Sequence, residues 1–169
     1  VNDLHRLLRM RARPKILMAE SFEDGVELYK KYQGSLLGVI SDVRFPREGR
    51  IDPHAGFRFA NMVKKEIPDL PFLIQSSSES NRKKAYEAGA AFLHKKSENL
   101  MADLHEYIMT NFGFGDFVFL NLKGKELGRA STLAEFEQII KVIPDESLIY
   151  HAERNHISIW LRARTEFAL

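Results

Sequence analysis

The sequence contains no cysteine, which excludes disulfides, thiolate chemistry and cysteine-ligated metals. No apolar stretch approaches the roughly 18 residues of a membrane span, and residues 1–6 lack the apolar centre of a signal peptide. Its 25 basic and 23 acidic side chains nearly cancel, so no general attraction to nucleic acid or anionic lipid is expected. These absences favour a cytoplasmic protein that binds neither nucleic acid nor membrane.

The composition is sufficient for one ordinary domain and a small addition. The 169 residues are 44% hydrophobic and 11% aromatic, which is ample for a packed core. The chain begins with Val1 and opens directly on a helical pattern over 3–12 that Pro14 stops. We therefore expect a fragment of a longer protein, in which the arginines of this first helix form a solvated face.

Strands and helices alternate over the first two-thirds of the chain. Apolar runs predict strands over 15–19, 36–40, 72–77 and 90–95. Helical periodicity predicts helices over 25–32, 57–67, 81–88 and 100–111. Crossovers of this length require parallel strands with right-handed connections, so the expected fold is an α/β, doubly wound parallel sheet. The 36–40 run should be buried on both faces.

The pattern changes at the glycines of 112–115. Residues 116–120 and 126–130 predict an antiparallel hairpin, and Thr132 is placed to cap a helix over 133–142 with Glu135 completing a capping box. A final stretch carries Trp160. We therefore expect two units, residues 1–113 and a small appended ββαα module over 114–169.

Three polar side chains come at the ends of consecutive predicted strands. These are Asp42, Ser76 and Lys95, and the ends of parallel strands share one edge of a sheet. A carboxylate beside a hydroxyl and an ammonium suits an aspartyl phosphate, with Asp42 attacking phosphorus while Lys95 and Ser76 contact phosphoryl oxygens. The alternative is an ordinary ion pair between Asp42 and Lys95, with Ser76 as a turn residue.

Four stretches resemble a response-regulator receiver domain of the flavodoxin-like, CheY-like kind. They are residues 42–46, 55–57, 70–77 and 85–95. The resemblance implies that Asp42 is the phosphoacceptor, that Ser76 is the hydroxyl switch residue and that Lys95 pairs with the phosphate. It further implies that Phe92 is the switch aromatic on the last strand.

The sequence departs from the receiver pattern at its beginning. Receivers carry an acidic pair after their first strand, and this pair holds the Mg²⁺ that phosphoryl transfer requires. The better alignment makes 15–19 the second strand and leaves the first strand before Val1. Only Asp42 and the backbone carbonyl of Arg44 then remain as metal ligands. We expect weak or absent Mg²⁺ binding by this chain and poor phosphorylation by small phosphodonors.

A second resemblance extends over nearly the whole chain. Residues 7–15, 38–47, 112–117, 151–156 and 160–167 resemble the N-terminal regulatory part of bacterial phosphoenolpyruvate synthase-like and pyruvate phosphate dikinase-like proteins. The resemblance implies a non-enzymatic signal-transduction module with two kinds of partner, a histidine kinase or other phosphodonor and a downstream PEP/pyruvate-binding catalytic region. A homodimer is compatible with this class.

Other functions remain as alternatives. A degenerate receiver would serve as a protein-interaction scaffold without phosphorylation. A small hydrolase using Asp42 as nucleophile is disfavoured because no second carboxylate is placed as acid or base. His151 and His156 are five residues apart, off one helix face, so we expect a polar surface or an interface there and not a metal site.

Overall fold

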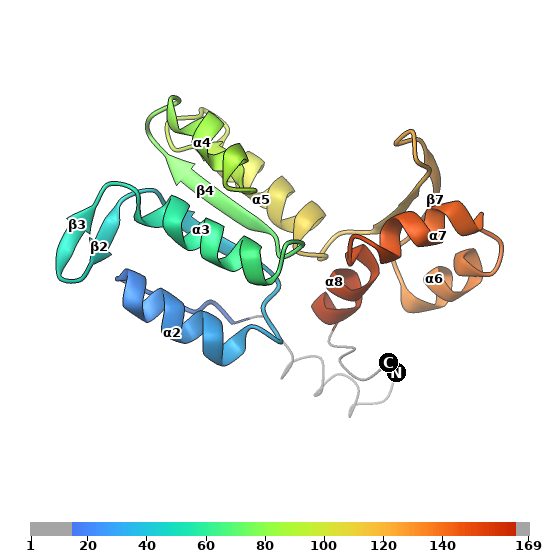
Figure 1. Cartoon of the computed structure of the whole chain (residues 1–169). Coiled ribbons are helices and arrows are strands. Elements are labelled where there is room, and N and C mark those ends of the chain that lie inside the picture. The colour runs from blue at the N-terminus through green and yellow to red at the C-terminus, as the bar shows by residue number, and fades with distance from the viewer. Residues whose placement is uncertain (1–14, 165–169) are drawn as a thin grey trace, which may run out of the picture.

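The computed structural model describes residues 15–164, which form two lobes joined by a short linker (Figure 1). The N-terminal lobe comprises the described residues up to Gly113, and the C-terminal module comprises 114–164. The helix predicted over 3–12 lies outside the described residues. None of the helices within 15–164 is both long and apolar enough to cross a membrane.

A three-stranded parallel sheet forms the centre of the N-terminal lobe. Its strands are β1 (Val39–Asp42), β4 (Phe72–Ser76) and β5 (Ala91–His94), in the order β1-β4-β5. Phe72, Leu73 and Ile74 of the central strand are almost fully buried. The mixed α/β class and the parallel sheet are confirmed.

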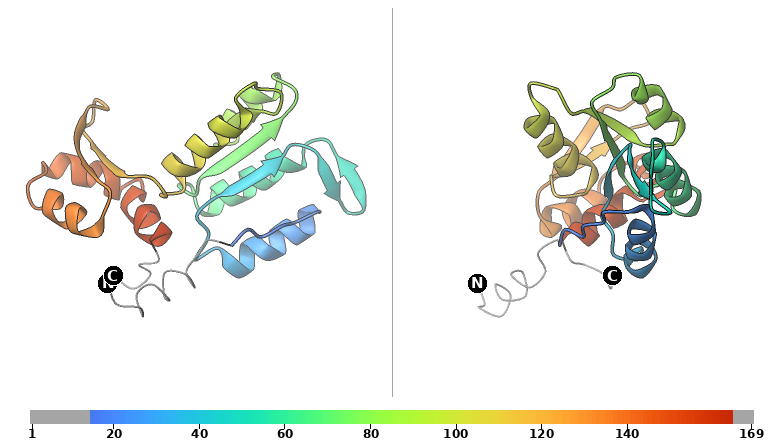
Figure 2. Two further views of the ribbon diagram at one scale, coloured as in Figure 1. Left: turned by 180° about the vertical axis from the view of Figure 1, so that it is seen from behind. Right: turned by 90° about the vertical axis from the view of Figure 1, so that its left-hand side faces the viewer.

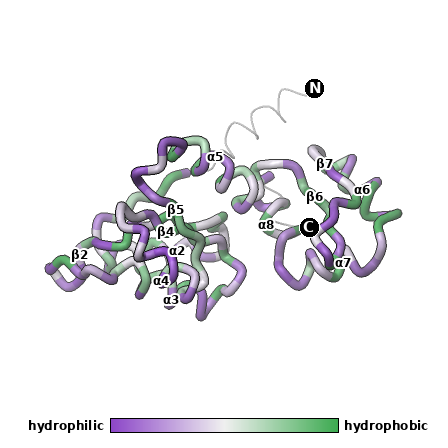
Figure 3. The backbone as a smooth tube through the Cα atoms, turned by 90° about the horizontal axis from the view of Figure 1, so that it is seen from above, coloured by the Kyte–Doolittle hydropathy of each residue, from purple (hydrophilic) through white to green (hydrophobic). Residues whose placement is uncertain are grey.

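Helices lie on both faces of this sheet (Figure 2). Three of them cover one face: α2 (Phe22–Tyr32), α3 (Ala55–Glu66) and α4 (Asn81–Glu87). The other face carries α5 (Leu100–Asn111). The main core fills the first interface, where Phe59 of α3 packs edge-to-face on Phe72 of β4. Figure 3 shows the hydrophobic strands β4 and β5 within this lobe.

Helix ends in this lobe follow local sequence signals. The Ser21 hydroxyl accepts a hydrogen bond from the Asp24 backbone N–H at 3.1 Å, as the predicted N-cap requires. Pro68 follows the end of α3 closely. Gly89 ends α4 with a φ of 71°, the left-handed conformation that favours glycine. These three expectations are confirmed.

Two strand predictions are wrong. Residues 15–19 form no strand, because no strand within residues 15–164 pairs with them, and Ile16 and Met18 are 87% and 80% exposed. The strand β1 is not buried on both faces, since it lies at the edge of the described sheet and Ile40 is 41% exposed. An apolar run specifies a strand only where a partner supplies hydrogen bonds.

A small hairpin replaces the loop expected over 47–55. Its strands β2 (Phe45–Arg47) and β3 (Arg50–Asp52) pair antiparallel. Glu48 and Gly49 both have positive φ, 52° and 72°, as a two-residue hairpin turn of type I′ requires. The guanidinium of Arg47 lies 5.1 Å from the Phe22 ring centre, which fixes the hairpin against α2.

The C-terminal module packs three helices against a second hairpin. Its elements are β6 (Phe117–Leu120), β7 (Glu126–Ala130), α6 (Leu133–Ile140), α7 (Asp145–Ala152) and α8 (His156–Ala163). The expected ββαα pattern is therefore incomplete, because the final stretch is broken into two helices at Asn155, whose φ is +54°. The core of the module is aromatic: Phe117, Phe119, Phe136 and Trp160.

The cap of α6 differs in detail from the expected capping box. The Thr132 hydroxyl accepts from the Glu135 N–H at 3.2 Å, as expected. The Glu135 carboxylate, however, returns to the backbone N–H and hydroxyl of Ser131 at 2.8 and 2.7 Å. These bonds hold the pKa of Glu135 below its usual value.

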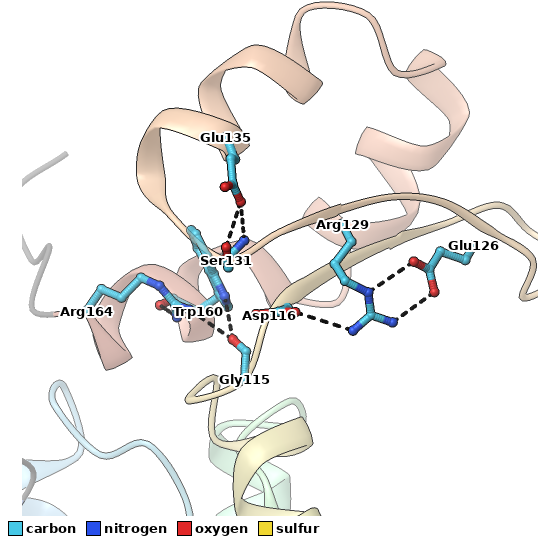
Figure 4. A network of polar contacts seen from close by, with 8 residues as sticks. All are labelled: Gly115, Asp116, Glu126, Arg129, Ser131, Glu135, Trp160 and Arg164. Carbon is cyan, nitrogen blue, oxygen red and sulfur yellow. Dashed lines mark hydrogen bonds and ion pairs between the residues drawn. The ribbon is translucent and has the colours of Figure 1, made fainter.

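The last helix fixes the linker between the lobes (Figure 4). Trp160 donates its indole N–H to the Gly115 carbonyl at 3.0 Å, and Arg164 donates to the carbonyls of Gly113 and Gly115 at 2.7 and 2.9 Å. The same guanidinium lies 3.6 Å from the centre of the Trp160 ring. A Cβ on Gly113 would lie 2.8 Å from the Ile159 carbonyl oxygen, so only glycine allows this close approach.

Candidate functional site

Asp42, Ser76 and Lys95 lie at one edge of the parallel sheet. Asp42 ends β1, Ser76 ends β4, and Lys95 directly follows β5. The Lys95 backbone N–H donates to the Ser76 carbonyl at 2.8 Å, which continues the ladder between β4 and β5. The topology thus brings three residues, distant in sequence, to the carboxyl ends of adjacent strands.

The Asp42 carboxylate forms an ion pair with Lys95. The Lys95 Nζ lies 2.5 Å from Asp42 Oδ1, and the two side chains are 35% and 49% exposed. An ion pair with this much solvent contact adds little stability. Its importance lies in its geometry, because it holds an ammonium beside a carboxylate that an incoming reagent can reach.

Ser76 is buried at the end of β4, and its hydroxyl contacts the residues that lead into α4. Its Oγ accepts hydrogen bonds from the Ser78 backbone N–H at 3.1 Å and from the Asn81 side-chain amide at 2.9 Å. Both bonds use the oxygen as acceptor, so the hydroxyl proton stays available for donation. The sequence predicts Asn81 only as the start of a helix, and no local pattern indicates that its amide contacts Ser76.

The position of Asp42 depends on the first turn of α3. The Gly56 N–H donates to the Val43 carbonyl at 2.9 Å. A Cβ on Gly56 would lie 2.1 Å from the backbone oxygen of Asp42 and 3.0 Å from Val43 Cα. A side chain at residue 56 would therefore displace the end of β1, and with it the Asp42 carboxylate.

Phe92 lies on β5 beneath the side chain of Arg82. The guanidinium is 4.7 Å from the ring centre, and the ring is buried with the core between the sheet and α4. Hydrogen bonds from Arg82 to Glu79 and Tyr86 keep the guanidinium in place, and they raise the pKa of Arg82. The Phe92 ring is thus covered by the Arg82 guanidinium, which these hydrogen bonds hold in place on α4.

An open groove of about 440 Å³ adjoins Phe92 between β5 and α5. Its lining includes Arg82 and Asp103, and also Tyr107, whose pKa burial raises to about 12. Asp103 accepts a hydrogen bond from the Ser97 hydroxyl at 2.9 Å, which ties α5 to the turn after Lys95. The groove is therefore connected through this turn to the sheet edge that carries Asp42.

The metal ligands predicted from the sequence are Asp42 and the backbone carbonyl of Arg44. Arg44 lies in the exposed turn directly after β1, two residues from Asp42. Among residues 15–164, no group of three or more His, Asp or Glu side chains lies close enough together to hold a metal ion. Asp42 contributes one carboxylate, and water or phosphate oxygens commonly complete the six ligands of Mg²⁺.

Comparisons with known proteins identify no relative. No protein-family model, no curated protein and no solved structure matches the chain.

Proposed function

We propose that the N-terminal lobe is a signal receiver of the two-component type with Asp42 as its phosphoacceptor. The observation that carries this proposal is the Asp42–Lys95 ion pair at the carboxyl edge of the sheet, with the Ser76 hydroxyl on the neighbouring strand. A carboxylate, an ammonium and a hydroxyl at one edge are the groups that an aspartyl phosphate needs.

The finer fold that we propose is the doubly wound receiver fold. In that fold one further parallel strand lies along β1, between β1 and the extended residues 15–20. The exposure of Ile16, Met18 and Ile40 supports this proposal, because an added strand would cover these apolar side chains. The unpaired outer edge of β1 would then have hydrogen-bond partners.

In the proposed reaction, a carboxylate oxygen of Asp42 attacks the phosphorus of a phosphohistidine or another phosphodonor. A bond forms between oxygen and phosphorus, the bond from phosphorus to the donor breaks, and its electron pair leaves with the donor. Lys95 exchanges its carboxylate partner for a phosphoryl oxygen, and the Ser76 hydroxyl donates to another. Mg²⁺ would neutralise further charge in the intact protein, with the Asp42 carboxylate as one of its ligands.

The output of this receiver is the face formed by β5 and α5. Movement of Ser76 toward a phosphoryl group weakens its bonds to Ser78 and Asn81 at the start of α4. Arg82 lies in the first turn of α4 and covers Phe92, so a shift of α4 uncovers this ring beside the groove. We propose that this face controls a PEP/pyruvate-handling enzyme, on the basis of the sequence resemblance.

The proposal is tested by locating a phosphoryl group on the chain. The protein is incubated with phosphoramidate and Mg²⁺, reduced with borohydride and mapped by mass spectrometry, which marks an aspartyl phosphate as homoserine. We expect substoichiometric labelling at Asp42 that Asp42→Asn abolishes. The matched control Asp52→Asn changes a carboxylate of the β2–β3 hairpin and should leave the labelling intact. Label that persists in Asp42→Asn, or that maps to another carboxylate, refutes the phosphoacceptor role.

One observation favours a second candidate function. Because no set of metal ligands gathers within residues 15–164, the lobe also fits a degenerate receiver that binds a protein partner without phosphorylation. This alternative predicts that Asp42→Asn leaves partner binding unchanged. The phosphoacceptor proposal predicts that Asp42→Asn abolishes any effect of the phosphodonor on that binding.

A further inference from the structure

The end of strand β6 is held by two side chains of helix α7. The Leu120 backbone N–H donates to His151 Nε2 at 2.8 Å, and the Ser147 hydroxyl donates to the Leu120 carbonyl at 2.8 Å. Ser147 and His151 are one helical turn apart, so they lie on the same face of α7. Both side chains are almost fully buried, and the pairing between β6 and β7 shifts its register at Leu120.

This arrangement fixes the proton positions on two imidazoles. A backbone N–H can only donate, so His151 Nε2 must accept and the proton of the neutral ring lies on Nδ1. His151 Nδ1 is 3.0 Å from His156 Nδ1, so His151 donates and His156 accepts. The proton of His156 then lies on its Nε2. The two hydrogen bonds therefore point in one direction: Leu120 donates to His151, and His151 donates to His156.

The same corner contacts the N-terminal lobe. His156 is the first residue of α8, and the preceding Asn155 has the left-handed conformation that separates α8 from α7. The Asn155 side-chain amide donates to Asp69 Oδ2 at 2.7 Å, in the loop between α3 and β4. The hydrogen bond between His151 and His156 thus joins α7 to α8 on either side of Asn155, the residue that contacts Asp69.

We propose that the His151–His156 hydrogen bond is an acid-sensitive latch that fixes the α7–α8 corner against the N-terminal lobe. The latch is closed when both rings are neutral. A proton added to His156 Nδ1 would set two N–H groups against each other, and a proton added to His151 Nε2 would face the Leu120 N–H. Either event breaks one of these two hydrogen bonds. The proposal does not depend on the role of Asp42.

The charged neighbours of the pair act in opposite directions. Arg154 lies in the corner, with its guanidinium 4.2 Å from the ring centre of Tyr150, and it disfavours a charge on either histidine. Asp69 on the opposite lobe favours a charge on His156. Burial is the largest effect on both rings, and it lowers the pKa of His156 and lowers that of His151 to about 4. The neutral pair is therefore the form present at neutral pH.

Imidazole NMR tests the proton positions directly. Long-range ¹H–¹⁵N spectra of the whole chain at about pH 7.5 should show His151 protonated on Nδ1 and His156 on Nε2. Between about pH 7 and pH 4, the protection of the Leu120 amide against hydrogen exchange should fall by about tenfold or more. A His151 protonated on Nε2 at neutral pH, or a Leu120 protection that is independent of pH, overturns the proposal.

The lobe contact is tested by a distance measurement between the lobes. Because the sequence has no cysteine, Lys83→Cys and Lys123→Cys allow one spin label on an exposed site of each lobe. We expect the distance distribution to broaden as the pH falls to about 4 in the wild-type background. His156→Gln keeps an acceptor that does not titrate, so its distribution should stay narrow, whereas His105→Gln on the exposed part of α5 should behave as the wild type. Equal broadening in His156→Gln and wild type refutes the latch.

Discussion

Replacement of Gly56 by alanine tests how the first turn of α3 positions Asp42. The new Cβ would lie 2.1 Å from the Asp42 backbone oxygen and 3.0 Å from Val43 Cα, so the helix and the end of β1 must separate by about 1 Å. Overpacking of this kind costs about 1–3 kcal/mol. Weakening of the bond from the Gly56 N–H to Val43 costs roughly 1 kcal/mol more. We expect the free energy of unfolding to fall by roughly 2–4 kcal/mol.

Urea unfolding followed by far-ultraviolet circular dichroism measures this loss. Gly34→Ala is the matched control, because a Cβ there meets no atom within 4 Å and should change stability by less than about 1 kcal/mol. The chemical shifts of Asp42 and Lys95 should move in Gly56→Ala, whereas the native emission of Trp160 in the other lobe should not. A Gly56→Ala protein as stable as Gly34→Ala would falsify the close packing of α3 on β1.

Three further predictions concern other parts of the chain. Gly38→Ala would place a Cβ 2.1 Å from the Phe112 ring. Urea unfolding should show that the free energy of unfolding falls by about 1–3 kcal/mol. We expect a smaller loss than for Gly56→Ala, because a side-chain ring moves more easily than backbone. Thr132→Ala removes the N-cap of α6 and should cost about 1 kcal/mol in the same assay. The pKa of His151 is lowered to about 4, so the unfolded chain binds more protons below about pH 6.5. This contribution to the free energy of unfolding should therefore be fully present above about pH 6.5 and fall by up to about 3 kcal/mol as the pH drops to about 4. Urea midpoints that do not change across this pH range would contradict the burial of the His151 ring.

Local signals in the sequence predict much of the N-terminal lobe. Ser21 and Gly89 mark helix ends through bonds and backbone angles that depend on a few neighbouring residues. The shared edge of Asp42, Ser76 and Lys95 follows from the alternation of strands and helices alone. These features are predictable because each depends on short-range chemistry or on the rule that parallel strands point the same way.

The remaining features depend on contacts that no local pattern records. Residues 15–19 have the composition of a strand, but a strand exists only where another strand pairs with it. The spacing of His151 and His156 excludes one helix face, and the rings meet only because Asn155 takes a left-handed conformation and starts a second helix. The β2–β3 hairpin depends on positive φ at Glu48, a residue that rarely adopts it.

The hydrogen bonds from Trp160 and Arg164 to the linker have a consequence for the order in which the chain folds during synthesis. During translation the N-terminal lobe leaves the ribosome first, followed by the linker and the β6–β7 hairpin. The carbonyls of Gly113 and Gly115 acquire these two partners only after residue 164 has emerged, about fifty residues later. The joint between the lobes is therefore completed last. In a nascent chain stalled before α8, the N-terminal lobe would be folded, while the second lobe could still move relative to it.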